Sequence, residues 1–305
     1  GPMEVGLALP QYDYAAGAGG RLEWATVVEW AHHAARAGFG SLWLADHLFL
    51  SVEKYGGPAG DRFGYDPVPA LAGLARATGL GVGTLVLCAQ LRPPRVVAKQ
   101  LETLRDLAPA GVVAGVGAGW FEPEYRAGGV AFGRPGERLR QLARTVEVLR
   151  ERLDPKGGPV WVGGRGDRLL EVAARHAAGW NTVWAWTEAA YRERLAVLHA
   201  ACERAGRDPA TLTRSVGLYA LVGESEADLR RRFDRLRELS PPGVLDDVTL
   251  DDWRVGRLVG TVEQVREQVG RWRDLGVAVL IVALGAVPFT MTTSDDLDLV
   301  ASALL

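Results

Sequence analysis

Asp46 and His47 are neighbouring side chains that could move a proton or orient a bound ligand. An imidazole gains and loses a proton near neutral pH, and an adjacent carboxylate can orient that ring or contact a ligand itself. A structural alternative is that Asp46 caps a helix beside a hydrogen-bonded His47. The remaining histidines fall inside predicted outer helices, so His47 is the candidate for proton transfer.

A glycine-rich run over residues 115–125 follows a predicted strand. Small residues such as Gly117 let a planar ligand approach the backbone, and Trp120, Glu122 and Tyr125 could surround that ligand. A flexible loop is the alternative interpretation. We take Gly117 as a candidate cofactor contact and Glu122 as a second candidate for proton transfer.

Gly163, Gly164 and Arg165 follow the next predicted strand and lead directly into a helix. Exposed amides at a helix N-terminus, glycines that permit close approach and one Arg together form a phosphate site. The alternative is a tight turn that Asp167 caps. The run lacks the Lys-Ser/Thr pair of a P-loop, so nucleoside triphosphate hydrolysis is not indicated.

Trp184 ends another predicted strand, where its ring could stack on a ligand or pack at the rim of a barrel. No grouped His, Asp and Glu pattern is typical of a metal site, and no G-x-S-x-G turn marks a nucleophilic serine. We therefore expect no metal, and neither metal-assisted hydrolysis nor acyl transfer.

These candidates follow short apolar runs with the character of buried parallel strands. The runs cover residues 5–9, 41–45, 80–88, 112–116, 160–162, 182–185, 215–222 and 277–283. Helical patterns alternate with them, over residues 21–37, 66–77, 95–108, 137–153, 168–178, 188–205 and 261–275. Asp66 before Pro67 predicts a capped helix start. The glycines predicted to follow helix ends are Gly38, Gly79, Gly179, Gly206 and Gly276.

Alternating strands and helices over 305 residues predict a (β/α)8 TIM barrel. An open dinucleotide-binding sheet would carry G-x-G-x-x-G after the first strand, which this chain lacks. Two segments, 47–65 and 223–260, are longer than ordinary loops and follow strands, and the second carries an extra helix over 226–239. We expect both at the C-terminal mouth of the barrel, as lids or substrate walls, with surface decoration as the alternative.

Composition excludes several classes of protein. A hydrophobic content of 48%, a mean hydropathy of +0.02 and a net charge of −2 indicate a globular protein with no footprint for nucleic acid or a membrane. Two distant cysteines favour a reducing cytoplasm. Gly1 and Pro2 precede Met3 and look like the remnant of a cleaved tag, so we expect one domain over residues 3–305.

Six motifs, in order along the chain, resemble the bacterial luciferase-like superfamily, and in particular its branch that uses the deazaflavin coenzyme F420. They are SLWLADH (41–47), GTLV (83–86), GVGAGWFEPEY (115–125), PVWVGG (159–164), AAGWN (177–181) and GTVEQV (260–265). The resemblance implies a luciferase-like barrel with the tricyclic ring against the third strand, behind which the Leu85–Val86 peptide bond is cis.

The same resemblance implies the roles of individual residues. Asp46 would contact the deazaflavin, His47 would donate or accept a proton, and Gly163, Gly164 and Arg165 would hold the phosphate of the cofactor. Leu85, Val86, Gly117 and Trp184 complete the expected cofactor contacts, with Glu122 as the secondary proton-transfer residue.

The predicted function is hydride transfer between F420 and a small, partly hydrophobic organic substrate. One alternative is a two-component monooxygenase that uses FMN on the same barrel, since FMN-dependent members can also carry a His at this place. A second alternative is a cofactor- or metabolite-binding protein without turnover. The resemblance also implies a homodimer.

Overall fold

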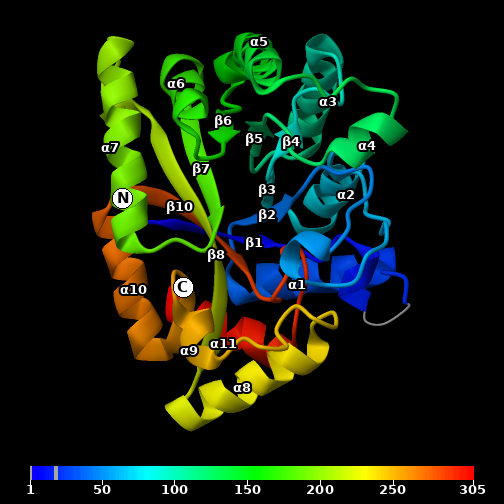
Figure 1. The fold of residues 1–305 in the computed structure, drawn as a ribbon, viewed down its shortest axis with the longest axis vertical. Coiled ribbons are helices and arrows are strands. Elements are labelled where there is room, and N and C mark those ends of the chain that lie inside the picture. Colours follow the sequence, from blue (N-terminus) through cyan, green and yellow to red (C-terminus); the bar gives the residue numbers. More distant parts are fainter. Residues whose placement is uncertain (1, 17–19) are drawn as a thin grey trace.

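The strands form a closed, parallel, eight-stranded barrel in a computed structural model that describes residues 2–16 and 20–305 (Figure 1). Gly1, half of the presumed tag remnant, lies outside the described residues. The barrel strands, each hydrogen-bonded to the next, are β1 (Glu4–Ala8), β2 (Ser41–Leu44), β3 (Gly81–Thr84), β5 (Val112–Gly117), β6 (Val160–Gly163), β7 (Gly179–Trp184), β8 (Thr213–Gly223) and β10 (Val277–Ala283). β10 pairs with both β8 and β1, which closes the barrel and confirms the predicted fold.

Two further strands lengthen this barrel at its C-terminal end. β4 (Leu87–Cys88) continues the third strand beyond the Leu85–Val86 bond and pairs with β5. β9 (Leu258–Thr261) pairs with the last part of β8, which extends beyond its pairing with β10.

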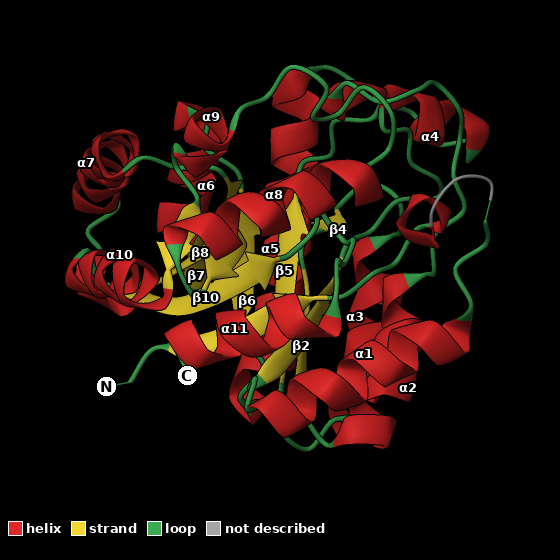
Figure 2. Cartoon of the chain, turned by 90° about the horizontal axis from the view of Figure 1, so that it is seen from below, coloured by secondary structure: helices red, strands yellow, loops and turns green. Residues whose placement is uncertain are grey.

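Helices surround the strands on the outside, as Figure 2 shows. The outer helices are α1 (Trp24–Ala37), α2 (Pro67–Thr78), α3 (Pro94–Leu107), α5 (Pro135–Leu153), α6 (Asp167–His176), α7 (Glu188–Arg204), α10 (Val262–Asp274) and α11 (Ser294–Leu304). The additional helices are α4 (Glu122–Ala127), α8 (Glu226–Leu239) and α9 (Leu250–Arg254), and short 3-10 turns cover Asp13–Ala16, Glu53–Tyr55, Asp154–Lys156 and Pro209–Thr211. No helix within the described ranges is long and apolar enough to cross a membrane.

The helix ends follow local capping chemistry. Asp66 accepts a hydrogen bond from the amide of Val68, and Pro67 occupies the first turn of α2, as predicted. Gly38, Gly79, Gly206 and Gly276 all have positive φ at helix ends, which an L side chain adopts less readily. The prediction for Gly179 is wrong, because this glycine begins β7 and gives space to Trp161: a Cβ there would lie 2.4 Å from the indole.

Two tryptophans fill the interior of the barrel. Trp43 on β2 and Trp161 on β6 stack with ring centroids 5.3 Å apart. Glycines on β1 and β3 make room for Trp43, since a Cβ at Gly6 or Gly83 would lie 2.3 or 2.2 Å from its indole. The barrel is therefore a packed core rather than a pore, and only its C-terminal mouth can be hollow.

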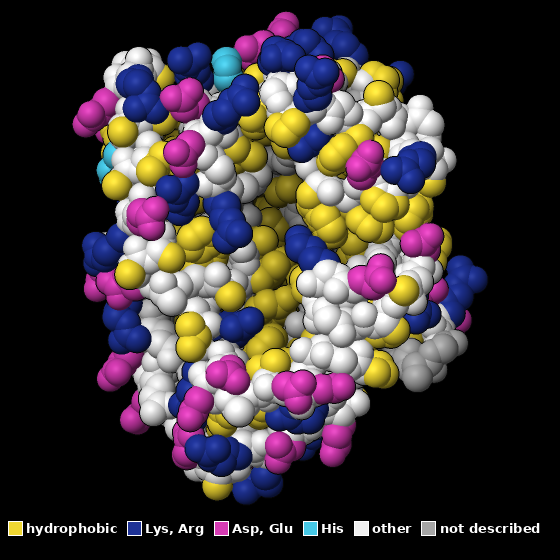
Figure 3. Space-filling view, viewed as in Figure 1, with side chains coloured by type: hydrophobic (Ala, Val, Ile, Leu, Met, Phe, Trp, Pro, Cys, Tyr) yellow, Lys and Arg dark blue, Asp and Glu magenta, His cyan; other side chains and the backbone are white. Residues whose placement is uncertain are grey.

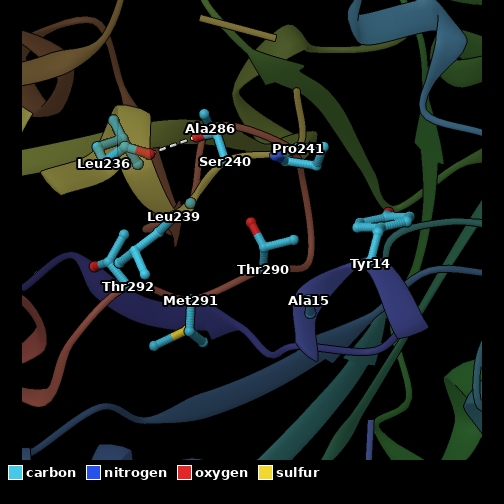
Figure 4. Close-up of a pocket in the computed structure, with 11 residues that line it drawn as sticks. Tyr14, Ala15, Leu236, Leu239, Ser240, Pro241, Ala286, Thr290, Met291 and Thr292 are labelled. Carbon is cyan, nitrogen blue, oxygen red and sulfur yellow. Dashed lines mark hydrogen bonds between the residues drawn. The ribbon is translucent and has the colours of Figure 1, made fainter. Parts of the chain in front are cut away.

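The two long segments have little regular structure around short elements. Residues 47–65 contain one 3-10 turn and two isolated bridges, Leu50 with Arg62 and Tyr12 with Gly64. Residues 223–260 contain α8 and α9, and α8 packs along β8. The end of α8 meets the segment around Thr290 at a hollow of only about 10 Å³, where Ser240 donates a hydrogen bond to the carbonyl of Leu236 (Figure 4). That hollow is too small for an organic ligand.

Candidate active site

A cavity of about 650 Å³ opens at the C-terminal ends of the barrel strands. Hydrophobic side chains form the floor of the hollow and Lys and Arg side chains border it (Figure 3). The residues predicted for the site that line this cavity are His47, Leu85, Val86, Gly163, Gly164, Arg165 and Trp184. The structure thus brings together seven predicted residues from four strand ends and the loops after them.

The Leu85–Val86 peptide bond is cis, as the resemblance implied. Val86 lies where β3 gives way to β4, against the ends of β5 and β6. A Cβ at Gly117 or Gly163 would lie 2.8 Å from a methyl carbon of Val86. Gly117 is not among the residues that line the cavity, so its absent side chain makes room for Val86 rather than for a ligand.

His47 lines the cavity and contacts a fully buried carboxylate. Its Nδ1 lies 2.9 Å from Oε1 and 3.1 Å from Oε2 of Glu124 on α4. A carboxylate only accepts hydrogen bonds, so we assign a proton to Nδ1, which leaves Nε2 as the ring nitrogen available for chemistry. The amide of Leu48 donates a further hydrogen bond to Glu124 and fixes the carboxylate against the ring. This arrangement suits a general acid or base whose orientation is preset.

The structure does not bring Glu122 to this site. The side chain of Glu122 is 56% exposed at the start of α4 and lies 3.6 Å from Arg126, its helical neighbour. Two residues further along the helix the backbone turns Glu124 inward, so that Glu124, and not Glu122, contacts His47. Glu124 is buried in the folded chain, and no short spacing in the sequence separates it from Glu122.

Asp46 is buried and is not among the residues that line the cavity, so its role as a cofactor contact stays a prediction. Its carboxylate accepts bonds of 2.7 and 3.1 Å from the two terminal nitrogens of Arg92, and a 2.9 Å bond from the amide of Cys88. Both oxygens are therefore engaged within the protein. Asp46, which follows β2, thus binds both Cys88 on β4 and Arg92 just before α3. These contacts position the wall that carries Leu85 and Val86.

Cys88 lies between Asp46 and Glu124. Its thiol donates to the carbonyl of Asp46 at 3.1 Å, and burial raises the pKa of the thiol well above its ordinary value. His47, Cys88 and Glu124 bring possible metal-ligand atoms within 4.8 Å of one another. Each of these groups already has a hydrogen-bonding partner in the described structure, so we interpret the cluster as a hydrogen-bond network.

Gly163, Gly164 and Arg165 form the turn between β6 and α6. Gly164 has a φ of 142° and donates its amide to the carbonyl of Asn181 on β7. Arg194 on α7 donates to the carbonyl of Arg165 and to the carboxylate of Asp167, at 2.9 and 2.7 Å. Hydrogen bonds to Asn181 and Arg194 thus fix the backbone of the turn, while the Arg165 side chain remains exposed at the cavity mouth.

Aromatic side chains form the opposite wall. Trp184 lies 5.9 Å from Tyr219 on β8 and 5.6 Å from Phe289, measured between ring centroids. Phe289 is the one non-glycine residue with positive φ in the described part of the chain, at 62°. Trp184 therefore belongs to a packed aromatic cluster and at the same time offers one face to the cavity.

Sequence reasoning missed two cations on the cavity wall, Lys54 and Arg257. Both come from the two long segments, and no short motif marks either residue. The Lys54 amine lies 3.8 Å from the centre of the Trp120 ring, and Trp120 in turn lies 5.5 Å from His47. Partial burial and the charge of Arg165 lower the pKa of Lys54, so these two cations share one region of the mouth.

The sequence profile of the luciferase-like monooxygenase family matches residues 3–278. The chain belongs to this family. Among its relatives, a phthiodiolone/phenolphthiodiolone dimycocerosates ketoreductase from Mycobacterium kansasii is 26% identical, over 82% of this chain and 88% of the relative. The F420-dependent hydroxymycolic acid dehydrogenase of Mycobacterium tuberculosis is 28% identical, over 88% of this chain and 79% of the relative.

Solved structures support the fold of this luciferase-like protein. An F420-dependent secondary alcohol dehydrogenase in complex with an F420-acetone adduct superposes with a TM-score of 0.77 and 16% identity. The match covers 99% of this chain and 98% of the other.

Proposed function

We propose that the protein is an F420-dependent oxidoreductase that transfers a hydride between the deazaflavin and a small organic substrate. The observation that carries this proposal is the His47–Glu124 pair, held against a large cavity whose charged lining residues, apart from the imidazole, are cations. The activities in the names of the two mycobacterial relatives, an F420-dependent dehydrogenase and a ketoreductase, support the choice of cofactor and reaction.

The residues present fit such a cofactor in size and shape. A volume of about 650 Å³ lies within the range of roughly 300–1,000 Å³ typical of cofactor sites. Leu85 and Val86 line the cavity and give an apolar wall for one face of a planar ring, and the glycines at 163 and 164 let a phosphate approach the backbone. Arg165, with Lys54 near it, supplies the positive charge.

The charge of the cavity favours an anionic cofactor. Lys54, Arg165 and Arg257 line it, and no Asp or Glu does so among the described residues. The whole chain has a net charge of −2, so this local excess of positive charge is specific to the site. The negative charge of a cofactor phosphate would balance the positive charge of these side chains.

When bound, F420 supplies or accepts a hydride in a two-electron step. His47 transfers the accompanying proton. When a carbonyl is reduced, Nε2 of the imidazolium donates a proton to the carbonyl oxygen. When an alcohol is oxidised, Nε2 of the neutral ring accepts the proton of the hydroxyl group. Glu124 keeps the ring in one orientation and stabilises the imidazolium while it carries the proton. Trp120, which Lys54 contacts, lies edge-on to His47 with ring centroids 5.5 Å apart and adds an apolar neighbour beside the imidazole.

Titration of the purified protein with F420 and, separately, with FMN tests the proposal. We expect the parent protein to bind F420 with a Kd in the micromolar range or below. Replacement of Arg165 by Met should weaken this binding at least about tenfold, because a charge-assisted contact to phosphate is lost. Reduction of F420 by a panel of alcohols then tests turnover. Tight binding of FMN without affinity for F420 would identify the monooxygenase alternative, and F420 binding without any turnover would favour a binding protein.

We also propose a homodimer that works in the cytoplasm. Val96 and Leu107 on α3 are exposed apolar residues that suit contact with a second protomer, and both cysteines are free and buried. Light scattering coupled to size exclusion measures the mass, and a monomer at micromolar concentration would contradict the dimer.

A further inference from the structure

Arg257 is a cation on the cavity wall that the hydride-transfer chemistry does not use. It immediately precedes β9 and comes from the long segment that follows β8. Its guanidinium carbon lies 4.0 Å from the centre of the Trp253 ring and 5.4 Å from that of Tyr219. One terminal nitrogen donates a 3.0 Å bond to the carbonyl of Val255. The group is therefore positioned by aromatic faces and one backbone contact.

No carboxylate compensates Arg257 in the described part of the chain. Its Nε is buried and lacks a hydrogen-bonding partner. Burial lowers the pKa of Arg257, which indicates a cation that has lost water without gaining a counter-ion. The Nε of Arg254, three residues earlier, also lacks a hydrogen-bonding partner, but this side chain has counter-ions, because it pairs with Glu226 and lies 3.9 Å from Asp251.

Arg257 comes from a different segment of the chain than the cations expected at the cofactor phosphate. Arg165 follows β6, and its charge affects Lys54. Arg257 instead lies over the rings of Trp253 on α9 and Tyr219 on β8. Arg257 thus lies beside the aromatic cluster of Trp253, Tyr219 and Trp184 on the cavity wall.

We propose that Arg257 binds an anionic group, a carboxylate or a phosphate ester, on the substrate of this enzyme. Its planar fork of N–H donors suits such a group, and the aromatic wall suits an adjacent apolar or aromatic portion. The substrate class is therefore an organic acid or phosphate ester that carries a hydroxyl or carbonyl group within reach of His47. The assignment to substrate rests on the proposed function.

Binding of simple probes tests this proposal without turnover. Phenylacetate and phenyl phosphate are titrated by calorimetry or ligand-observed NMR into the protein, with and without F420, and neutral phenylacetamide serves as the uncharged control. We expect Arg257→Met to weaken binding of at least one anionic probe about tenfold or more while phenylacetamide is unaffected. Arg254→Met, which removes a cation that already has partners, is expected to leave anion binding unchanged.

Cofactor affinity distinguishes the two sources of negative charge. If Arg257 serves the substrate, Arg257→Met binds F420 within about threefold of the parent protein, whereas Arg165→Met does not. Equal probe binding by the parent and Arg257→Met, or a loss of F420 affinity in Arg257→Met as large as in Arg165→Met, would overturn the proposal. Arg257→Lys, which keeps the charge but not the planar fork, should bind the probes with intermediate affinity and covers the case in which Arg257→Met does not fold.

The outcome is independent of the cofactor assignment. If the parent protein binds the anionic probes through Arg257 but does not bind F420, the proposed function fails and the anion site stands. If it binds F420 but not the probes, the proposed function stands and the inference about Arg257 fails.

Discussion

The carboxylate of Glu124 contacts the imidazole of His47 although 77 residues separate them in the chain, with Nδ1–Oε distances of 2.9 and 3.1 Å. Glu124 is fully buried, and His47 is 10% exposed and faces the cavity. The pair therefore joins an interior carboxylate to a ring that can exchange a proton with a ligand. This contact identifies Glu124, rather than Glu122, as the acidic residue of α4 that orients His47.

Replacement of Glu124 by Gln should lower kcat by about 10- to 100-fold, because a charge-assisted hydrogen bond of roughly 1.5–3 kcal/mol to His47 is weakened. Glu122→Gln is the matched control on the same helix and should leave kcat within about twofold. Steady-state rates of F420 reduction measure both. Loss of activity in Glu122→Gln, with Glu124→Gln unaffected, would restore the role originally expected for Glu122.

Replacement of His47 by Ala should lower kcat by about 10²- to 10⁴-fold, the usual contribution of a positioned general acid or base. Binding of F420 should change far less, because the phosphate contacts near Arg165 remain. Fluorescence titration separates the two effects. Full activity of His47→Ala would exclude His47 from proton transfer.

Asp46→Asn should lower the free energy of unfolding by about 3–5 kcal/mol, because Arg92 would be left as a largely buried cation with a weaker partner. Arg192→Met removes an exposed ion pair with Glu188 on α7 and should cost less than about 1 kcal/mol. Urea denaturation measures both changes. A stable Asp46→Asn variant with a large loss of cofactor affinity would instead support direct contact between Asp46 and the cofactor.

Stability should fall as the pH rises above about 9. Burial raises the pKa of Cys88 and of Tyr12, Tyr14 and Tyr219 well above their ordinary values of 9.0 and 10.0. In this range the unfolded chain releases protons that the folded chain retains, so the free energy of unfolding decreases with increasing pH. Urea midpoints measured between pH 7 and pH 10.5 test this sign, and a midpoint that rises with pH contradicts it.

Gly117→Ala should destabilise the protein by about 1–3 kcal/mol and disturb the wall formed by Leu85 and Val86, because the new Cβ would lie 2.8 Å from Val86. Gly270→Ala within α10 meets nothing within 4 Å and should stabilise the helix by about 0.5–1 kcal/mol. Thermal unfolding of the two variants gives the comparison. If Gly117→Ala keeps the parent stability and loses only cofactor binding, then this glycine contacts the ligand after all.

The sequence by itself determined the barrel, the capped start of α2 at Asp66 and the placement of His47 and Arg165 at strand ends. Each of these depends on patterns within a few residues: apolar runs, cap residues and glycines next to strands. The motifs also indicated the family, and the resemblance to that family implied the cis bond at Leu85–Val86.

Only the tertiary structure decided which way individual side chains point. The choice of Glu124 over Glu122 depends on which face of α4 meets the segment that follows β2, and the ion pair of Asp46 depends on Arg92, which precedes α3. Lys54 and Arg257 come to the cavity from long segments whose course no local pattern specifies. Contacts between residues far apart in the chain follow from packing of the whole barrel, and short spacings carry no information about them.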